Sequence, residues 1–328
     1  MIRTFGILLD LQLKHIEYMR EAYEVDAFDT SKNFGRAFEG VTVTATRNRF
    51  TRVLHVNMTV DVPKMLNKGD ITASDFLIVE LKLKEIIDTL YGDDNLYYHH
   101  RLTRIDYRYD AVVEDQTIRQ VYIDLFKKSY RKKARRLKEM GRINLQGEFE
   151  EYGTGLEHVN GSVETAIYDK MSERIEKKKP IKDYERDVLR FEVRLKKDFL
   201  AYQKREYDAE RKLETYFTND KYKKMMEKFI LETYLVSDFH KYSQALEKIE
   251  KSHYSIRRKK SIENFLGIVT RGDLSSPQKS MSPATFKNRL TECNELGFHP
   301  ITIPNTWKHV ADCLGNPLAP LCKKINEE

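Results

Sequence analysis

The sequence predicts an α+β fold, with an antiparallel sheet and helices in residues 1–200 and a mainly helical region in residues 201–328. Two observations support this prediction. Several stretches of the first region alternate apolar and polar residues with the period of a half-buried strand, and segments of helical periodicity separate them. From Lys197 onward the strand patterns largely disappear, and apolar residues recur at helical spacing.

The strand pattern predicts where the sheet lies in the chain. In the first such stretch, Leu54, Val56 and Met58 alternate with polar residues, as they do in a strand with one buried face. The expected strands are Arg52–Val60, Leu102–Ala111, Ser162–Lys170 and Val188–Lys197.

Capping residues predict the ends of the helices. Ser74 is the expected N-cap of a helix that ends at Gly92, and a second helix is expected over Gln116–Met140. Near the C-terminus, Ser282 precedes Pro283, which is typical of an N-cap and a first helical residue, with Gly297 as the stop. This last unit suits either a small DNA-recognition module or a cap over the core.

The composition limits the class of protein. Of 328 residues, 40% are hydrophobic and 33% charged, which is too apolar for a disordered chain and too charged for a membrane protein. We find no apolar run of membrane-spanning length and no signal-peptide pattern, so we expect a cytoplasmic protein without a membrane partner. The cysteines Cys293, Cys313 and Cys322 have no C-x-x-C spacing, so neither a disulfide framework nor a zinc site is indicated.

Positive charge is concentrated in short runs. The net charge is +7, and KKSYRKKARRLK at Lys127–Lys138 contains eight basic residues and no acid, while Lys177–Lys179 and Arg257–Lys260 are smaller basic clusters. Such patches suit a DNA backbone, although a solvated helix face is the alternative. The DNA-binding candidates in the largest run are Lys127, Lys128, Arg131, Lys132, Lys133, Arg135 and Arg136.

Three of the expected strands have one polar face. These faces carry, respectively, Asp106 between two arginines, Tyr168 with Lys170, and Glu192 between two arginines. If the strands are neighbours in one antiparallel sheet, the polar faces meet. A phenol, a lysine and carboxylates that can hold a divalent cation are the groups needed to transfer a phosphodiester to a protein side chain. Ordinary cross-strand ion pairs on a solvated face are the alternative.

The motifs on these strands resemble a known family. They are TRIDYRYDA at Thr103–Ala111, AIYDKMSER at Ala166–Arg174 and LRFEVRLKK at Leu189–Lys197. In this order they are similar to the replication initiation proteins typified by the filamentous-phage gene II protein, with relatives on rolling-circle plasmids and in integrated elements. The similarity covers about Arg52 to Leu200.

The resemblance implies a metal-dependent endonuclease that nicks one DNA strand at an origin and later rejoins it. Residues 1–200 would form the nicking domain, and residues 201–328 would bind DNA or a partner. Tyr168 would attack the phosphate, leaving a 5′-phosphotyrosine and a 3′-OH primer for a host polymerase, with a host helicase as a further partner. The implied roles of the other residues are metal ligands (Mg²⁺ or Mn²⁺) for Asp106 and Glu192, phosphate stabilisation for Lys170, and contacts to the DNA backbone for Arg104 and Arg194.

The sequence departs from the family pattern in two places. Related nickases carry two histidines around one hydrophobic residue, where this chain has His55-Val56-Asn57, so either His55 is a metal ligand or oxygen ligands hold the metal. Lys170 follows the tyrosine by two residues instead of three, and Tyr152 and Tyr184 are rival nucleophiles. A relaxase of a mobile element and a DNA-binding protein without catalysis are the alternative functions.

Overall fold

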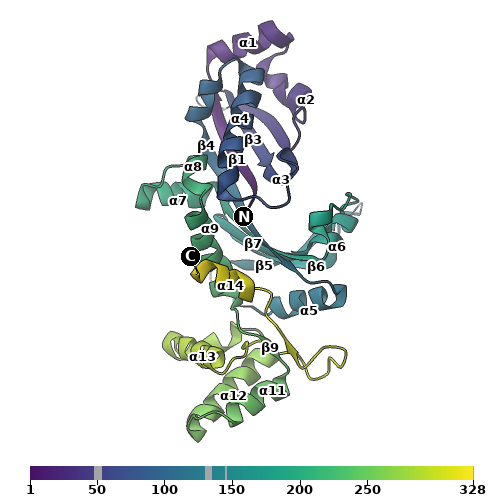
Figure 1. Ribbon diagram of the computed structural model, residues 1–328, viewed down its shortest axis with the longest axis vertical. Helices are drawn as coiled ribbons and strands as arrows, with labels where there is room; N and C mark the ends of the chain where they lie inside the picture. Colours follow the sequence, from purple (N-terminus) through teal and green to yellow (C-terminus); the bar gives the residue numbers. More distant parts are fainter. Residues whose placement is uncertain (48–53, 130–134, 145, 328) are drawn as a thin grey trace. The chain divides into compact units, whose positions relative to one another are not determined.

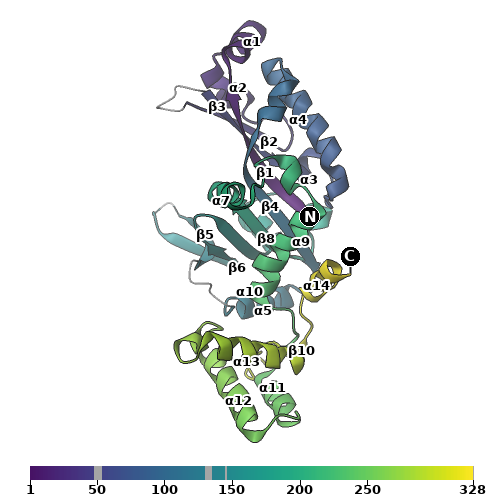
Figure 2. The same cartoon turned by 90° about the vertical axis from the view of Figure 1, so that its left-hand side faces the viewer.

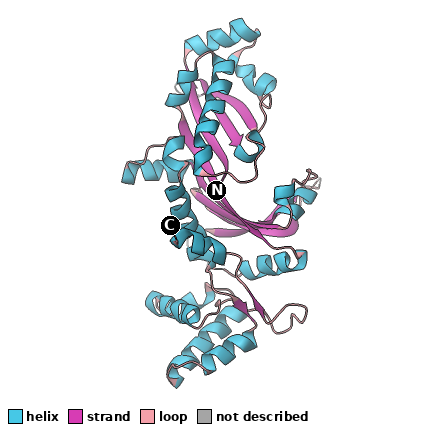
Figure 3. Cartoon of the chain, viewed as in Figure 1, coloured by secondary structure: helices cyan, strands magenta, loops and turns pink. Residues whose placement is uncertain are grey.

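A computed structural model describes residues 1–47, 54–129, 135–144 and 146–327. In these residues the chain forms fourteen α-helices and ten strands (Figures 1 and 3). Eight strands hydrogen-bond in the order β2-β3-β1-β4-β8-β7-β6-β5, and every pair whose register is described is antiparallel. The predicted α+β class is confirmed.

The strands include two at the N-terminal end of the chain that the sequence patterns did not predict, β1 and β2. The sheet strands are β1 (Ile2–Leu11), β2 (Val41–Arg47), β3 (Leu54–Asp61), β4 (Arg101–Val112), β5 (Arg136–Ile143), β6 (Phe149–Val159), β7 (Val163–Asp169) and β8 (Val188–Lys196). The short strands β9 (Phe239–His240) and β10 (Cys313–Leu314) form a separate pair.

The helices are short before β8 except for α4, and they dominate after it. They are α1 (Leu13–Tyr23), α2 (Thr30–Phe34), α3 (Val62–Met65), α4 (Phe76–Tyr91), α5 (Gln116–Phe126), α6 (Lys170–Glu176), α7 (Lys197–Tyr207), α8 (Leu213–Tyr216), α9 (Asn219–Met226), α10 (Glu232–Tyr234), α11 (Tyr242–Glu250), α12 (Ile256–Arg271), α13 (Pro283–Glu295) and α14 (Ala319–Asn326). No helix in the described ranges is long and apolar enough to cross a membrane.

The described chain divides into two compact units that interleave in sequence. Unit 1 comprises residues 1–108, 161–164 and 192–225, and unit 2 comprises residues 109–160, 165–191 and 226–328. Strands β4, β7 and β8 therefore contribute residues to both units. The functional division at residue 200 stays a prediction.

The core of unit 1 forms between α4 and strands β1 and β3. Val79, Leu83 and Ile87 of α4 are fully buried, and α4 lies along these strands in both views (Figures 1 and 2). Gly92 ends the helix in the left-handed region at φ 65°, as predicted. The helical segment begins two residues earlier than predicted, because Thr72 and not Ser74 caps the 3₁₀ turn that precedes α4.

The core of unit 2 contains a cluster of aromatic rings and a buried arginine. The Phe126 ring lies 5.5 to 5.6 Å from those of Phe191, Tyr234 and Phe239. Arg119, completely buried, donates from Nε to Asp169 at 2.8 Å. In the C-terminal part, Ser282 caps α13 and Gly297 adopts φ 70°, so the predicted helix is confirmed.

The predicted helix over Gln116–Met140 is wrong in its second half. Helix α5 ends at Phe126, and Arg136 begins strand β5, which forms an antiparallel hairpin with β6. Like charges four residues apart destabilise a helix, and the basic run offers no acid to offset them. Arg131, Lys132 and Lys133 lie outside the described residues.

The predicted end of the third strand also needs correction. The third predicted strand ends at Asp169, whose side chain accepts hydrogen bonds from the backbone of Met171 and Ser172 and caps α6, so Lys170 is helical. In the charged stretch that follows, Glu173 is buried, because it pairs with Lys170.

Gly155 of β6 leaves room for Tyr168, which gives a stability test. A Cβ at position 155 would lie 2.5 Å from the Tyr168 Cβ and 2.6 Å from the Ile167 carbonyl oxygen. Since backbone cannot move aside cheaply, Gly155→Ala should lower the free energy of unfolding by about 1–3 kcal/mol in urea titrations. Gly161→Ala is the matched control, since its nearest atom is 3.8 Å away. Equal stability of the two variants would contradict this packing.

Because His299 is buried, we predict that the free energy of unfolding falls in acid. Its Nε2 donates to the Tyr234 carbonyl at 2.9 Å, and burial lowers its pKa to about 4. The unfolded chain, with an imidazole pKa of about 6.5, takes up the proton first as the pH falls, so stability is lost between about pH 6.5 and 4, by about 3 kcal/mol in full. We expect the pH dependence of the unfolding free energy to be shallower in His299→Gln. Parallel curves for the two proteins would contradict this role of His299.

Candidate functional site

Asp106 and Glu192 form the centre of a charged cluster in unit 1. Both side chains are completely buried. Arg104 binds Asp106 through two hydrogen bonds, from Nε at 2.7 Å and Nη2 at 2.6 Å. Glu192 accepts from Arg3 at 2.5 Å through one carboxylate oxygen and from Arg194 at 3.2 Å through the other. The predicted residues Asp106, Glu192, Arg104 and Arg194 are therefore brought together.

Arg3 belongs to this cluster because of a β-bulge. The register of β1 with β4 pairs Ile2 with Tyr107 and Thr4 with Asp106, which leaves Arg3 as an extra residue. A bulge of this kind re-aims a side chain. The sequence signal was present but missed, since the buried positions Ile2 and Phe5 are three residues apart, an odd spacing that interrupts the alternation.

The two carboxylates influence each other electrostatically. Burial raises the pKa of the Asp106 carboxyl, and the negative charge of Glu192 raises it further, although Arg104 opposes both effects. Removing charged groups from water is costly unless an opposite charge is close. The pair therefore favours any positive group that approaches it, and arginines occupy that place here.

Glu164 and Lys196 extend the cluster along β7 and β8. Lys196 donates to one oxygen of Glu164, and Arg194 Nη1 lies 3.4 Å from the other. Burial alone would raise the pKa of Glu164, but the hydrogen bond and charge of Lys196 lower it overall. The Glu164 carboxylate therefore stays ionised and offsets part of the cationic charge of the cluster.

His55 lies apart from Asp106 and Glu192. Its Nδ1 is 2.6 Å from Asp10 on the neighbouring strand, and Arg101 binds both oxygens of Asp10 at 2.9 Å. On β1, Asp10 is six residues from Thr4, the partner of Asp106, a span of roughly 20 Å. A metal site that uses His55 together with Asp106 is not assembled by this register.

Tyr168 occupies a buried position in unit 2. Its side chain is 1% exposed, and Gly155 of β6, the neighbouring strand in the sheet, lies against its Cβ. The Lys170 ammonium lies 5.7 Å from the centre of the Tyr168 ring, so the structure brings these two predicted residues together. Alternation along β7 directs Tyr168 to the same face of that strand as Glu164.

Lys170 is bound by carboxylates. It lies 2.7 Å from Glu173 and 3.6 Å from Glu185, and Arg174 also binds Glu185. Burial alone would raise the pKa of Glu173, yet Lys170 and Lys177 lower it to about 2. The buried ammonium is thus neutralised within the chain.

The rival tyrosines are more accessible than Tyr168. Tyr152 is partly exposed and lines a cavity of about 200 Å³ that is walled by β5, β6 and α6. Glu139, Glu157 and Lys177 line the same cavity. Tyr184 is also partly exposed, with Lys182 5.8 Å from its ring. The sequence patterns did not predict this cavity, because β5 and β6 were not recognised as strands.

Three described members of the largest basic run have partners inside the chain, namely Lys127, Lys128 and Arg135. Lys127 lies 3.5 Å from Glu139 and 3.4 Å from Glu151. Lys128 donates to the Thr270 carbonyl, and the Arg135 guanidinium stacks 4.8 Å from the ring centre of Phe229. Arg136 is exposed on β5. Lys127, Lys128 and Arg135 are therefore engaged by the protein itself.

The residues of the cluster do not fit a divalent cation as they are arranged. Each oxygen of Asp106 and Glu192 accepts a hydrogen bond from an arginine. Across the described segments, no group of three or more His, Cys, Asp or Glu side chains is placed to hold a metal ion. A cation would have to displace arginines, so we assign no chemical step to a metal.

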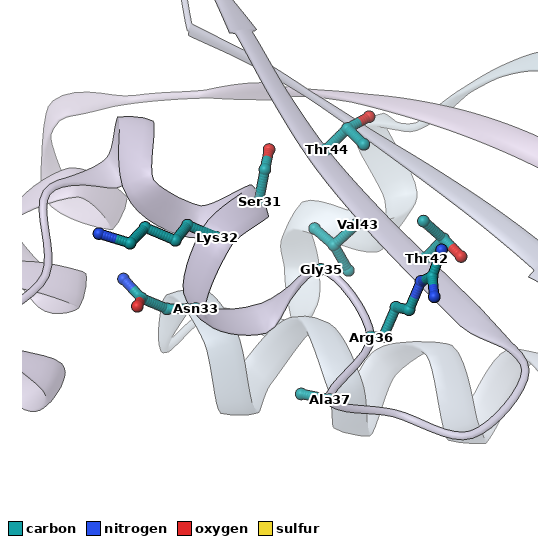
Figure 4. Close-up of a pocket in the computed structure, with 9 residues that line it drawn as sticks. All are labelled: Ser31, Lys32, Asn33, Gly35, Arg36, Ala37, Thr42, Val43 and Thr44. Carbon is teal, nitrogen blue, oxygen red and sulfur yellow. The ribbon is translucent and has the colours of Figure 1, made fainter.

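A second hollow, of about 490 Å³, lies between α2 and β2 in unit 1 (Figure 4). Its polar groups bind backbone N–H groups of β2, at the edge of the sheet. Ser31 Oγ accepts a hydrogen bond from the Ala45 N–H, and the Gly35 carbonyl accepts one from the Val43 N–H. None of the predicted site residues lines it.

Comparison with protein-family models and with curated proteins gives no match to this chain.

The Arg3–Glu192 pair gives a test of the cluster. Removing one partner leaves a buried charge uncompensated, so Arg3→Gln and Glu192→Gln should each destabilise the fold, and the double variant should cost less than their sum. We expect a coupling energy of about 1–3 kcal/mol from urea unfolding of the four proteins. The exposed pair Arg186–Asp183 is the control and should show no measurable coupling. Additive effects at Arg3 and Glu192 would contradict the interaction.

Proposed function

We propose that this protein is a replication initiator that nicks one DNA strand at an origin and later rejoins it. The observation that carries the proposal is the cluster around Asp106 and Glu192, in which guanidinium groups surround buried carboxylates. Arginine binds phosphate through the same paired hydrogen bonds that it offers to carboxylate. The resemblance of the three strand motifs to replication initiators supports the same reading.

Arg104 is the arginine best placed to release its carboxylate partner and bind a phosphate instead. Its side chain is 43% exposed, whereas its partner Asp106 is completely buried. Because the pKa of Asp106 is raised, this carboxyl can accept a proton when a phosphate takes over its arginine. In this proposal Arg104 and Arg194 bind the DNA backbone, and Asp106 takes up a proton.

Tyr168 is the proposed nucleophile. Its phenol loses a proton, the oxygen forms a bond to phosphorus, and the bond from phosphorus to the 3′ oxygen breaks. The 3′ oxygen takes up a proton and becomes the primer for a polymerase, while the 5′ end stays on the tyrosine. Since one phosphodiester replaces another, the reverse reaction rejoins the strand.

The burial of Tyr168 sets a condition on this chemistry. A phosphate can reach the phenol only after the groups packed around it move aside, because the Tyr168 side chain is 1% exposed. Lys170 must likewise exchange Glu173 or Glu185 for the phosphate before it stabilises the transition state. The proposed enzyme is thus inactive in the described arrangement and becomes active on DNA binding.

A DNA-binding protein without catalysis is the second candidate function. The observation in its favour is the 1% exposure of Tyr168. In that case the charged cluster of unit 1 contributes to binding or stability, and no covalent bond to DNA forms.

The nicking proposal is tested by a covalent adduct. Labelled single-stranded DNA of random sequence is incubated with the protein and Mg²⁺ or Mn²⁺, with a chelator in a parallel sample, and separated on a denaturing gel. We expect a protein–DNA adduct that is absent in Tyr168→Phe and retained in the control Tyr202→Phe, whose side chain is exposed. Loss of at least about a hundredfold in adduct yield is expected, because no other group replaces the nucleophile.

Other results would change the assignment. An adduct that survives in Tyr168→Phe but disappears in Tyr152→Phe or Tyr184→Phe would assign the reaction to the more accessible tyrosine. If the protein and its variants bind the same DNA but none forms an adduct, the result would support the DNA-binding function without catalysis.

A further inference from the structure

Helix α12, in unit 2, presents an outer face that is made of hydrogen-bond donors. Its inner face buries Ile262, Phe265, Leu266 and Val269. In the opposite direction the helix exposes Arg257, Lys260, Ser261, Asn264 and Arg271. These positions fall on one stripe of the helix, since they are separated by three, one, three and seven residues.

The cations of this stripe are not neutralised by the chain. Among the residues that the structure describes, Arg257, Lys260 and Arg271 have no ion-pair partner, and Ser261 and Asn264 have no hydrogen-bond partner for their side chains. The neighbouring cations are engaged, since Arg258 binds Glu292 at 2.5 Å and Lys259 donates to the Glu250 carbonyl. The contrast separates structural cations from those that are free to bind a partner.

The position of the cations also destabilises helix α12 itself. Cations in the first turn are unfavourable, because the N-terminus of a helix carries partial positive charge. Arg257 lies in that turn, which contains no acid, and Ser255 makes no side-chain cap there. A negatively charged partner would remove this unfavourable interaction.

The length and chemistry of the stripe fit the major groove of DNA. The groove is about 12 Å wide and admits one α-helix. From Arg257 to Arg271 the stripe extends roughly 21 Å along the helix. Asn side chains pair with adenine edges and Ser hydroxyls with several bases, while arginine and lysine bind phosphates on either side.

Helix α12 is held firmly enough to serve this purpose. It packs beside α11 and α13, as both views show (Figures 1 and 2). Ring contacts between Phe265 and Phe286, at 6.0 Å, join α12 to α13. The outer stripe is thus presented by a rigid element and not by a loop.

We propose that α12 is a duplex-DNA recognition helix, with Asn264 and Ser261 reading base edges and Arg257, Lys260 and Arg271 contacting phosphates. This surface is distinct from the charged cluster of unit 1, and it does not depend on strand nicking. Its partner is the DNA duplex.

The affinity test uses a fluorescent 30-base-pair duplex of random sequence at several salt concentrations. In the triple variant Arg257→Gln, Lys260→Gln, Arg271→Gln, the slope of log affinity against log salt should fall by about 2 to 3, because three phosphate contacts are lost. The control variant Lys82→Gln, Lys287→Gln, Lys324→Gln removes the same charge from exposed sites on other helices. The thermal midpoint should not decrease in the α12 variant, since its outer face supports no packing.

The specificity test uses selection from a pool of duplexes with twenty random base pairs. We expect Asn264→Ala to lose the preference at adenine-containing positions that the wild type enriches, while its salt slope stays unchanged. A salt slope equal to that of the wild type in the α12 variant would overturn the proposal, as would an equal loss in the control variant. Reduced binding to vesicles of phosphatidylserine without a change in DNA binding would also overturn it.

These outcomes are separable from those of the nicking proposal. Duplex binding is measured without cleavage, so absence of a covalent adduct leaves the α12 result intact. Conversely, an adduct that depends on Tyr168 in a protein whose α12 variant binds normally would support nicking and reject α12 as the recognition helix.

Discussion

The burial of the Asp106 and Glu192 carboxylates is the constraint on which the charged face of unit 1 depends. Two acids that are shielded from water and close to each other are unfavourable unless positive groups approach them. Three cations, Arg3, Arg104 and Arg194, meet this need directly. Lys196 pairs with the neighbouring Glu164. The bulge that turns Arg3 toward Glu192 is part of the same solution, because a regular strand would direct this side chain elsewhere.

The same balance of charges bears on the phosphate recognition proposed for this cluster. An arginine that already binds a carboxylate has the geometry to bind phosphate, and the cost of the exchange depends on what happens to the released acid. For Asp106 that cost is reduced, since its raised pKa lets the carboxyl become neutral. In the proposed function the same groups would serve stability and phosphate binding, so stability and DNA-binding measurements must be made on the same variants.

The sequence predicted the parts of the fold whose pattern is local. The alternation in β3 and β4, the Gly92 stop of α4 and the Ser282 cap of α13 depend on neighbouring residues, and all are confirmed. The region after Phe126 was predicted wrongly, because the pairing of β5 with β6 is a tertiary contact that overrides the helical preference of a charged stretch. Strand β1 was missed because the bulge at Arg3 breaks its alternation.

In the candidate site, too, the sequence predicted local features but not the contacts made by distant parts of the chain. Asp106 and Glu192 were placed on the correct strands, since motif and alternation agree there. The burial of Tyr168 could not be predicted, because β6, the strand beside it at Gly155, is recognised only by its pairing. Lys170 was expected to face a phosphate, yet it is bound by Glu173 and Glu185, the second of them fifteen residues further along the chain.

For the proposed binding of DNA, the pairing of each cation is a better guide to the binding surface than the net charge. In the longest basic run, the described Lys127 and Arg135 interact with acids or an aromatic ring of the chain. On α12, the shorter run includes Arg257 and Lys260, which have no such partner among the described residues. A cation that the fold has already neutralised adds little to binding, because its existing partner must first be displaced. The unpaired cations of a short run can thus bind a phosphate backbone more favourably than a longer run that stabilises the protein.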